Sequence, residues 1–323
     1  MFDAFSWFIF IALVGGLLAL DLLVFHRHAR TVSMREAAAW VTVWVILGLG
    51  FGAFIFITRG PTSGAEYLAG YLIEYSLSMD NVFVFAVLFG YFAVPPAYQH
   101  RLLFWGVLGA IVFRAIFIVG GTALLDAFHP VIYVFGALLL YTAWRMAKAG
   151  TGHVDPAANP VLRLVRRIIP VTEGYEGQSF FVRRNGKLLA TPLFAALVVI
   201  ESSDIMFAID SVPAILSITT DSFIVFTSNA FAIMGLRSLY FLLAGLIDRF
   251  EYLKYGLAAL LAFAGLKMLT SDIFHLDVWI SLAIILGILV ISIVVSLLAT
   301  RGHGGPGPEG AGLIRAEADQ PGP

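Results

Sequence analysis

Long apolar runs alternate with polar connections along almost the whole chain. A membrane-spanning helix needs about 20 predominantly apolar residues, and each run approaches or exceeds that length. Nine runs can be counted, over residues 4–25, 38–58, 65–92, 102–125, 130–147, 191–216, 222–247, 252–271 and 278–299. The pattern predicts an all-α polytopic membrane protein with about nine transmembrane helices.

One polar connection is much longer than the others and covers residues 148–190. Its first part, "NPVLRLVRRII", indicates either a helix lying on the anionic inner leaflet or a solvated linker helix. Its second part, "SFFVRRNGKLLA", predicts a β-hairpin with a type I′ turn at Asn185-Gly186. Residues 1–300 are expected to form one transmembrane transporter domain. The Gly- and Pro-rich tail, 301–323, is expected to be disordered and cytoplasmic.

Composition supports a membrane protein and excludes several function classes. The chain is 60% hydrophobic and only 13% charged, with a mean hydropathy of +0.91. Its net charge of −1 gives no indication of a nucleic-acid partner. It has no cysteine, which excludes disulfides, thiolate metal sites and cysteine nucleophiles. No Lys or Arg precedes Arg27, so the first run is expected to be a retained helix rather than a cleaved signal peptide. The chain has no P-loop motif, so no ATPase is expected.

The distribution of Lys and Arg predicts the orientation in the membrane. Sixteen of them fall on the side of the long connection, and two, Arg59 and Lys267, fall on the side of the N-terminus. Short loops rich in Lys and Arg stay in the cytoplasm. We therefore expect a multi-pass protein of the bacterial inner membrane with its N-terminus outside and its C-terminus in the cytoplasm.

Two segments of the chain are related by an internal repeat. "EYSLSMDNVF" (74–83) aligns with "DIMFAIDSVP" (204–213) at an offset of 130, which places Glu74 on Asp204, Asp80 on Asp210 and Asn81 on Ser211. Further along, Arg114 aligns with Arg237 at an offset of 123, because the first copy is expected to hold a longer loop, "VPPAYQHR". Each copy contains three predicted helices, in residues 65–147 and 191–271. An odd number of crossings inverts the second copy, as in many secondary transporters.

Five acids fall inside the predicted spans, where each would cost about 2.5–3.5 kcal/mol at a lipid-facing helix centre. They must therefore face the protein interior or a water-filled cavity. One interpretation is an internal salt-bridge set in which Arg114 and Arg237 act as charge partners that hold the repeats together. Two guanidinium groups leave three carboxylates uncompensated, and this surplus favours a divalent cation, with or without protons. The acids are Glu74, Asp80, Glu201, Asp204 and Asp210.

Helical spacing extends this set to a predicted metal site. Glu74, Ser78 and Asn81 share a helix face, as do Asp204 and Ser211. Pro213 removes the backbone hydrogen bond to the carbonyl of Ile209, which leaves an oxygen available beside Asp210. The predicted site consists of Glu74, Asp80, Asn81, Glu201, Asp204, Asp210 and Ser211. Asp21 and Asn229 are expected to be structural.

The chemistry of these ligands indicates a class of cation. All seven His lie at predicted helix ends or in loops, so the core offers oxygen ligands, with the Met206 thioether as one further candidate. Carboxylate and carbonyl oxygens suit Mg²⁺, Ca²⁺ and Mn²⁺ better than Cu(I) or Zn²⁺.

Several stretches resemble the TerC family of integral membrane proteins, which is named for tellurium resistance and includes manganese exporters. They include "LDLLVFHRHARTVSMREA" (20–37), "EYSLSMDNVFVF" (74–85), "FFVRRNGKLLATPLF" (180–194), "VIESSDIMFAIDSVPAI" (199–215) and "FIVFTSNAFAIMGLRSLYFLL" (223–243). The resemblance implies a two-repeat transporter fold, efflux of Mn²⁺ and the same acidic site. Met206 stands where the family is expected to have Val or Leu.

The leading hypothesis is a secondary transporter that exports Mn²⁺ as its substrate, with protons as the expected counter-ion, and that needs no cofactor. An alternative is a membrane scaffold, insertion factor or stress-resistance factor without transport, which leaves the five buried acids unexplained. A third is an aspartyl hydrolase using Asp80 and Asp210, but the chain lacks a Gly-x-Gly-Asp motif. No enzyme activity is therefore expected.

Overall fold

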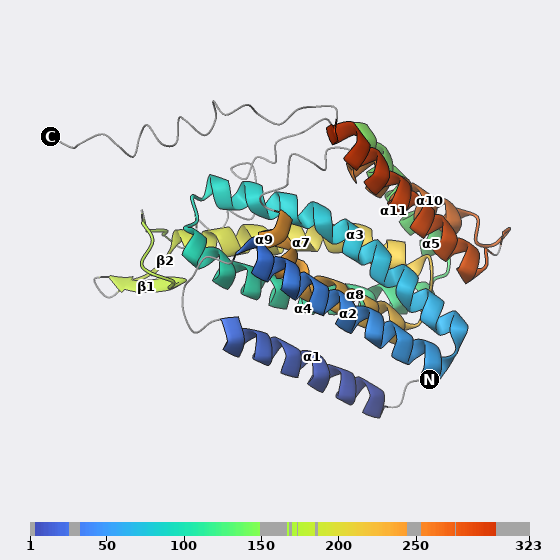
Figure 1. The fold of residues 1–323 in the computed structure, drawn as a ribbon, viewed down its shortest axis with the longest axis horizontal. Helices are drawn as coiled ribbons and strands as arrows, with labels where there is room; N and C mark the ends of the chain where they lie inside the picture. Colours follow the sequence, from blue (N-terminus) through green and yellow to red (C-terminus); the bar gives the residue numbers. More distant parts are fainter. Residues whose placement is uncertain are drawn as a thin grey trace.

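The computed structural model describes residues 4–25, 33–148, 167, 170–172, 174–184, 187–243, 253–274 and 276–301, and helices fill most of them (Figure 1). Its helices are α1 (Ala4–Phe25), α2 (Met34–Arg59), α3 (Pro61–Tyr91), α4 (Pro96–Ala127), α5 (Val131–Lys148), α7 (Pro192–Leu216), α8 (Ser222–Met234), α9 (Leu236–Leu243), α10 (Leu253–Leu269) and α11 (Val278–Arg301). Six spans in this part of the chain are long and apolar enough to cross a membrane. The chain is an all-α polytopic membrane protein, as its sequence predicts.

Helix ends follow local sequence signals. Ser33 caps α2 by accepting a hydrogen bond from the backbone N–H of Glu36 at 3.3 Å. Asp221 caps α8 by accepting from the backbone N–H of Phe223 at 2.9 Å. Between α2 and α3 stands Gly60, whose φ of +92° lies in the region that favours glycine. Gly60 alone connects α2 with α3.

One predicted helix start is wrong, and one predicted run, which remains a single candidate span, is divided within its length. Helix α4 begins at Pro96 and not at residue 102, so most of "VPPAYQHR" is helical and the connection covers only residues 92–95. Pro96 fits this start because the first helical position needs no backbone N–H. The predicted run 222–247 is divided at Gly235 into α8 and α9.

The predicted hairpin is confirmed. Strand β1 (Phe181–Arg184) pairs antiparallel with β2 (Lys187–Ala190), and the last pair is Arg184 with Lys187. Asn185 and Gly186, where the type I′ turn is predicted, lie outside the described residues. The same holds for nearly all of the predicted surface helix at 159–169 and for the tail beyond Arg301.

The helix contacts made by one predicted repeat have counterparts in the other. Helix α4 packs along α7 and α8 packs along α3, while α5 pairs with α10 and α3 with α7. A Cβ atom built on Gly70 of α3 would lie 2.8 Å from the Ser228 hydroxyl of α8, and one built on Gly106 of α4 would lie 3.0 Å from Ile200 of α7. Exchanging the two three-helix units leaves this pattern nearly unchanged. An inverted repeat requires this exchange, and the repeat itself stays a prediction.

Helices α3 and α7 lie side by side and run in opposite directions (Figure 1). Helix α7 begins beside the β-hairpin, at the end of the bundle where α3 finishes. Helices α5, α10 and α11 stand together at the other end of the view. Gly136 of α5 and Gly265 of α10 approach so closely that a Cβ on Gly265 would lie 2.8 Å from the carbonyl oxygen of Gly136. Such small-residue contacts are typical of packed membrane helices.

Candidate functional site

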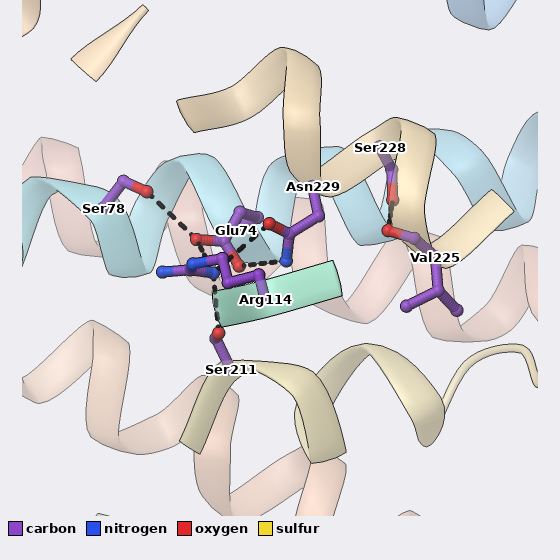
Figure 2. A network of polar contacts seen from close by, with 7 residues as sticks. All are labelled: Glu74, Ser78, Arg114, Ser211, Val225, Ser228 and Asn229. Carbon is purple, nitrogen blue, oxygen red and sulfur yellow. Dashed lines mark hydrogen bonds and ion pairs between the residues drawn. The ribbon is translucent and has the colours of Figure 1, made fainter. Parts of the chain in front are cut away.

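Glu74 lies at the centre of a buried polar network between helices from both halves of the chain (Figure 2). Its side chain is 0% exposed. Oε1 accepts a hydrogen bond from the Ser78 hydroxyl at 3.1 Å, and Oε2 accepts one from the Asn229 amide of α8 at 3.0 Å. The Arg114 guanidinium of α4 forms an ion pair with Oε1. Glu74 is thus a fully partnered carboxylate in the middle of α3.

Arg114 joins this network to the second half of the chain. Its side chain is 2% exposed, and Nη1 donates to the Ser211 hydroxyl of α7 at 2.8 Å. The same nitrogen lies 3.5 Å from Oδ1 of Asn229. Of the five buried acids, Arg114 forms its ion pair with Glu74.

Asp204 and Glu201 differ from Glu74 in lacking hydrogen-bond partners. Both carboxylate oxygens of Asp204, which is 1% exposed, and Oε2 of Glu201 are buried without a hydrogen bond to any described residue. Asp204 lies within electrostatic reach of both Arg114 and Glu74, and Glu201 within reach of Asp204. Because burying an unpartnered carboxylate is costly, these two acids are the groups best suited to take up a cation.

Asp80 and Asp210 lie on opposite sides of the point where α3 passes α7. Each follows its partner acid, Glu74 or Asp204, by six residues, which corresponds to about 9 Å along a helix. Because α3 and α7 run in opposite directions and Gly70 faces Ile215, Glu74 is level with Ser211, and Asp80 and Asp210 are offset by about five residues, or about 8 Å, along the bundle. Asp80 lies toward the hairpin end. Asp210 lies toward the other end, where Oδ1 accepts a hydrogen bond from Thr142 of α5 at 2.9 Å.

The predicted residues therefore do not form one ligand set in this arrangement. Among the described residues, no three acidic or histidine side chains come together closely enough to hold a metal ion. Asn81 is buried, and the Ser211 hydroxyl accepts a hydrogen bond from Arg114. Met206 is 60% exposed and faces away from the interior, so its thioether is not a ligand here. The equivalent residues of the two repeats are separated because α7 runs in the opposite direction to α3, which places them on opposite sides of the centre.

Arg237 is buried at the first turn of α9, directly after the break at Gly235. A break of this kind is common where transporter helices line a substrate site. Whether Arg237 pairs with one of the five acids stays a prediction.

Three polar residues of these sites were not recognised from the sequence. Asn229, expected to be structural, holds both Glu74 and Arg114. Thr142 holds Asp210, and no sequence signal marks it. Glu66 is half-buried, hydrogen-bonded to Thr219 and within electrostatic reach of Lys267. It precedes Glu74 by two helical turns on the same face, so helical spacing could have identified it.

Gly109 of α4 provides a test of Glu201. A Cβ atom at Gly109 would overlap the Glu201 carboxylate, whereas one at Gly120 of the same helix would meet nothing within 4 Å. The end of a glutamate side chain can turn aside, so Gly109→Ala should fold normally while it displaces that carboxylate. We expect a several-fold loss of cation efflux from cells expressing it. Gly120→Ala, the matched control, should keep both protein level and efflux. Unchanged efflux in Gly109→Ala would remove Glu201 from the site.

Comparison with known proteins decides the family. The model of the integral membrane protein TerC family matches residues 59–303, which include the five acids of the predicted site. The chain belongs to the TerC family. It is 50% identical over 295 residues to "Uncharacterized membrane protein STKORF319" of Myxococcus xanthus, covering 91% of this chain and 92% of that protein. No solved structure shows a significant match.

Other relatives carry a functional name. The chain is 48% identical over 299 residues to the Salmonella typhi protein named "Putative membrane-bound redox modulator Alx", covering 90% of this chain and 93% of that one. It is 46% identical over 306 residues to the protein of the same name in Escherichia coli (strain K12), covering 92% and 95%. The TerC resemblance seen in the sequence is thus confirmed.

Proposed function

We propose that the protein is a secondary transporter that exports a hard divalent cation, with Mn²⁺ as the leading substrate, from the cytoplasm. The observation that carries the proposal is the excess of acid over base in the middle of the bundle. Glu74 and Asp204 share one guanidinium, and Glu201 lies within electrostatic reach of Asp204; both oxygens of Asp204 and Oε2 of Glu201 are buried without a hydrogen bond to any described residue. Ionisable residues within membrane spans usually mark a substrate or proton pathway.

Asp80 and Asp210 extend this centre into a path. With the hairpin end in the cytoplasm, as the Lys and Arg distribution predicts, Asp80 lies on the cytoplasmic side and Asp210 on the outer side. An ion would pass these acids on its way from the hairpin end of the bundle to the other end. Because no three described acids converge in this arrangement, tight binding requires the two halves to move relative to each other.

The donor chemistry favours Mn²⁺, Mg²⁺ or Ca²⁺ over softer metals. The groups of the network that could bind a cation are carboxylate, hydroxyl and amide oxygens, and the thioether of Met206 faces outward. The absence of cysteine excludes thiolate ligands. Hard divalent cations prefer such oxygen sites. Protons are the counter-ion that the unpartnered carboxylates would accept.

A second candidate follows from the name of the Alx relatives, which describes a membrane-bound redox modulator. A redox role in this chain would have to act without cysteine thiols. A scaffold or stress-resistance role, including tellurite resistance, would need no acids in the membrane interior. Neither role explains the two unpartnered carboxylates, so transport is the function that the site supports best.

Metal content of cells tests the proposal. In a bacterial strain that lacks its manganese exporters, expression of this chain should lower cellular manganese and restore growth in excess manganese, because the oxygen-lined site favours this metal. Sensitivity to copper and zinc should not change. The same strain expressing Asp204→Asn at equal protein level is the control. Protection from copper or zinc without any effect on manganese would contradict the proposed substrate.

A further inference from the structure

The centre of the proposed site is occupied by a cation that belongs to the protein. The Arg114 guanidinium forms its ion pair with Glu74 and is 2% exposed. It is fixed by the Ser211 hydroxyl at 2.8 Å, while Asn229 supports both the guanidinium and Glu74 (Figure 2). A metal ion cannot share this position, because like charges in a buried site repel strongly.

One guanidinium serves two carboxylates of equivalent position in the predicted repeat. Glu74 has three partners, whereas Asp204 has no hydrogen bond to any described residue although Arg114 lies within electrostatic reach. The acid pair therefore carries one more negative charge than the protein's own cation can satisfy. An arriving divalent cation would neutralise this remaining negative charge if the guanidinium released Glu74.

The anchors of Arg114 connect the two halves of the chain. Arg114 and Glu74 belong to the first three-helix unit, while Ser211 and Asn229 belong to α7 and α8 of the second. Because Asn229 and Ser211 hold both members of the Arg114–Glu74 pair, displacing the guanidinium from Glu74 would disturb the contacts that join these units. Binding of the ion would thus be coupled directly to their relative movement.

We propose that Arg114 is a tethered cation: it holds the acidic centre in the absence of cargo, competes with the transported divalent cation for Glu74, and links ion binding to movement of the repeats. This inference rests on the proposed transport function. It assigns Arg114 a positioning role in the transport cycle, which a purely structural ion pair would not have.

The test compares binding and turnover of Mn²⁺ in purified full-length protein. Arg114→Gln removes the competitor but keeps hydrogen-bonding capacity, so the dissociation constant for Mn²⁺ should fall by about tenfold or more. Turnover in liposomes should fall at the same time. Without a guanidinium to displace the ion from Glu74, Mn²⁺ is released more slowly. A purely structural role predicts an unchanged or weaker affinity and a lower folded yield.

A second variant decides the matter if Arg114→Gln does not fold. Ser211→Ala removes one anchor of the guanidinium and leaves the ion pair with Glu74 in place. Easier displacement of Arg114 should strengthen apparent Mn²⁺ affinity, whereas loss of a direct metal ligand would weaken it. Ser228→Ala is the matched control: Ser228 donates to the carbonyl of Val225 in its own helix, away from Arg114 (Figure 2).

The outcomes separate this inference from the function on which it rests. If the unmodified protein neither binds nor transports Mn²⁺, the proposed function is wrong. If it does both, but neither Arg114→Gln nor Ser211→Ala strengthens binding, the tethered-cation role is overturned and transport stands. Tighter binding with slower turnover in Arg114→Gln, or tighter binding in Ser211→Ala with no change in Ser228→Ala, supports the role.

Discussion

Asp80→Asn and Asp210→Asn should each reduce Mn²⁺ efflux by about tenfold or more at normal protein level, because a hard cation depends on the charge of its ligands. The two variants should differ in the side of the membrane on which they act. Asp80 lies toward the hairpin end, so Asp80→Asn should raise the half-saturating concentration of Mn²⁺ on the cytoplasmic side. Asp210→Asn should leave that concentration nearly unchanged and lower the maximal rate.

Flux measured with Mn²⁺ added to either face of oriented vesicles distinguishes these effects. Asp126→Asn, at an exposed acid near the end of α4, is the control and should behave as the unmodified protein does. Folding should survive in all three variants, since a neutral amide costs less to bury than a carboxylate. Identical kinetic changes in Asp80→Asn and Asp210→Asn would contradict the placement of Asp80 nearer the hairpin end than Asp210.

The combined substitution of Glu74→Gln and Asp204→Asn should destabilise the protein by more than the sum of the single changes. In Glu74→Gln alone, Arg114 retains an acid within reach, Asp204. When both acids are gone, the guanidinium is buried without a counter-charge, a condition that costs about 3–5 kcal/mol in proteins. Thermal melting of the detergent-solubilised protein, followed by its monodisperse fraction, measures this coupling.

Glu74→Gln combined with Asp210→Asn provides the matched control. Asp210 is held by Thr142 of α5 and makes no described contact with Arg114, so these two changes should be nearly additive. Restoring neutrality with Arg114→Gln in the Glu74→Gln and Asp204→Asn background should recover much of the lost stability. Additive behaviour of Glu74→Gln with Asp204→Asn would show that Arg114 does not depend on both acids.

The sequence predicts the helices well because an apolar run of this length has few alternatives in a membrane. The pairing of Arg114 with a buried acid was also predictable, since charges in membrane spans usually find partners. Which acid it selects was not predictable, because helical spacing places Glu74 and Asp204 on one face of their helices but does not order the helices. That order appears only in the packing of α4 on α7 and α8 on α3.

The relative positions of the predicted site residues, which do not form a single ligand set, were the least predictable feature. Alignment of the repeats makes Asp80 and Asp210 equivalent, and equivalence suggests proximity. In an inverted arrangement, however, equivalent residues come level only where α3 passes α7, and Glu74, Asp80 and their counterparts lie to either side of that point. Asn229 was overlooked for a related reason: its partner, Glu74, lies 155 residues away in the chain.

The central claim is that this chain moves a hard divalent cation across a membrane. Uptake of Mn²⁺ into liposomes that contain the purified full-length protein tests it most directly, with protein-free liposomes and the Asp204→Asn variant measured beside it. We expect saturable Mn²⁺ uptake by the unmodified protein, weak or absent uptake of Zn²⁺, and loss of Mn²⁺ uptake in Asp204→Asn. Mn²⁺ uptake no faster than in protein-free liposomes would contradict the claim.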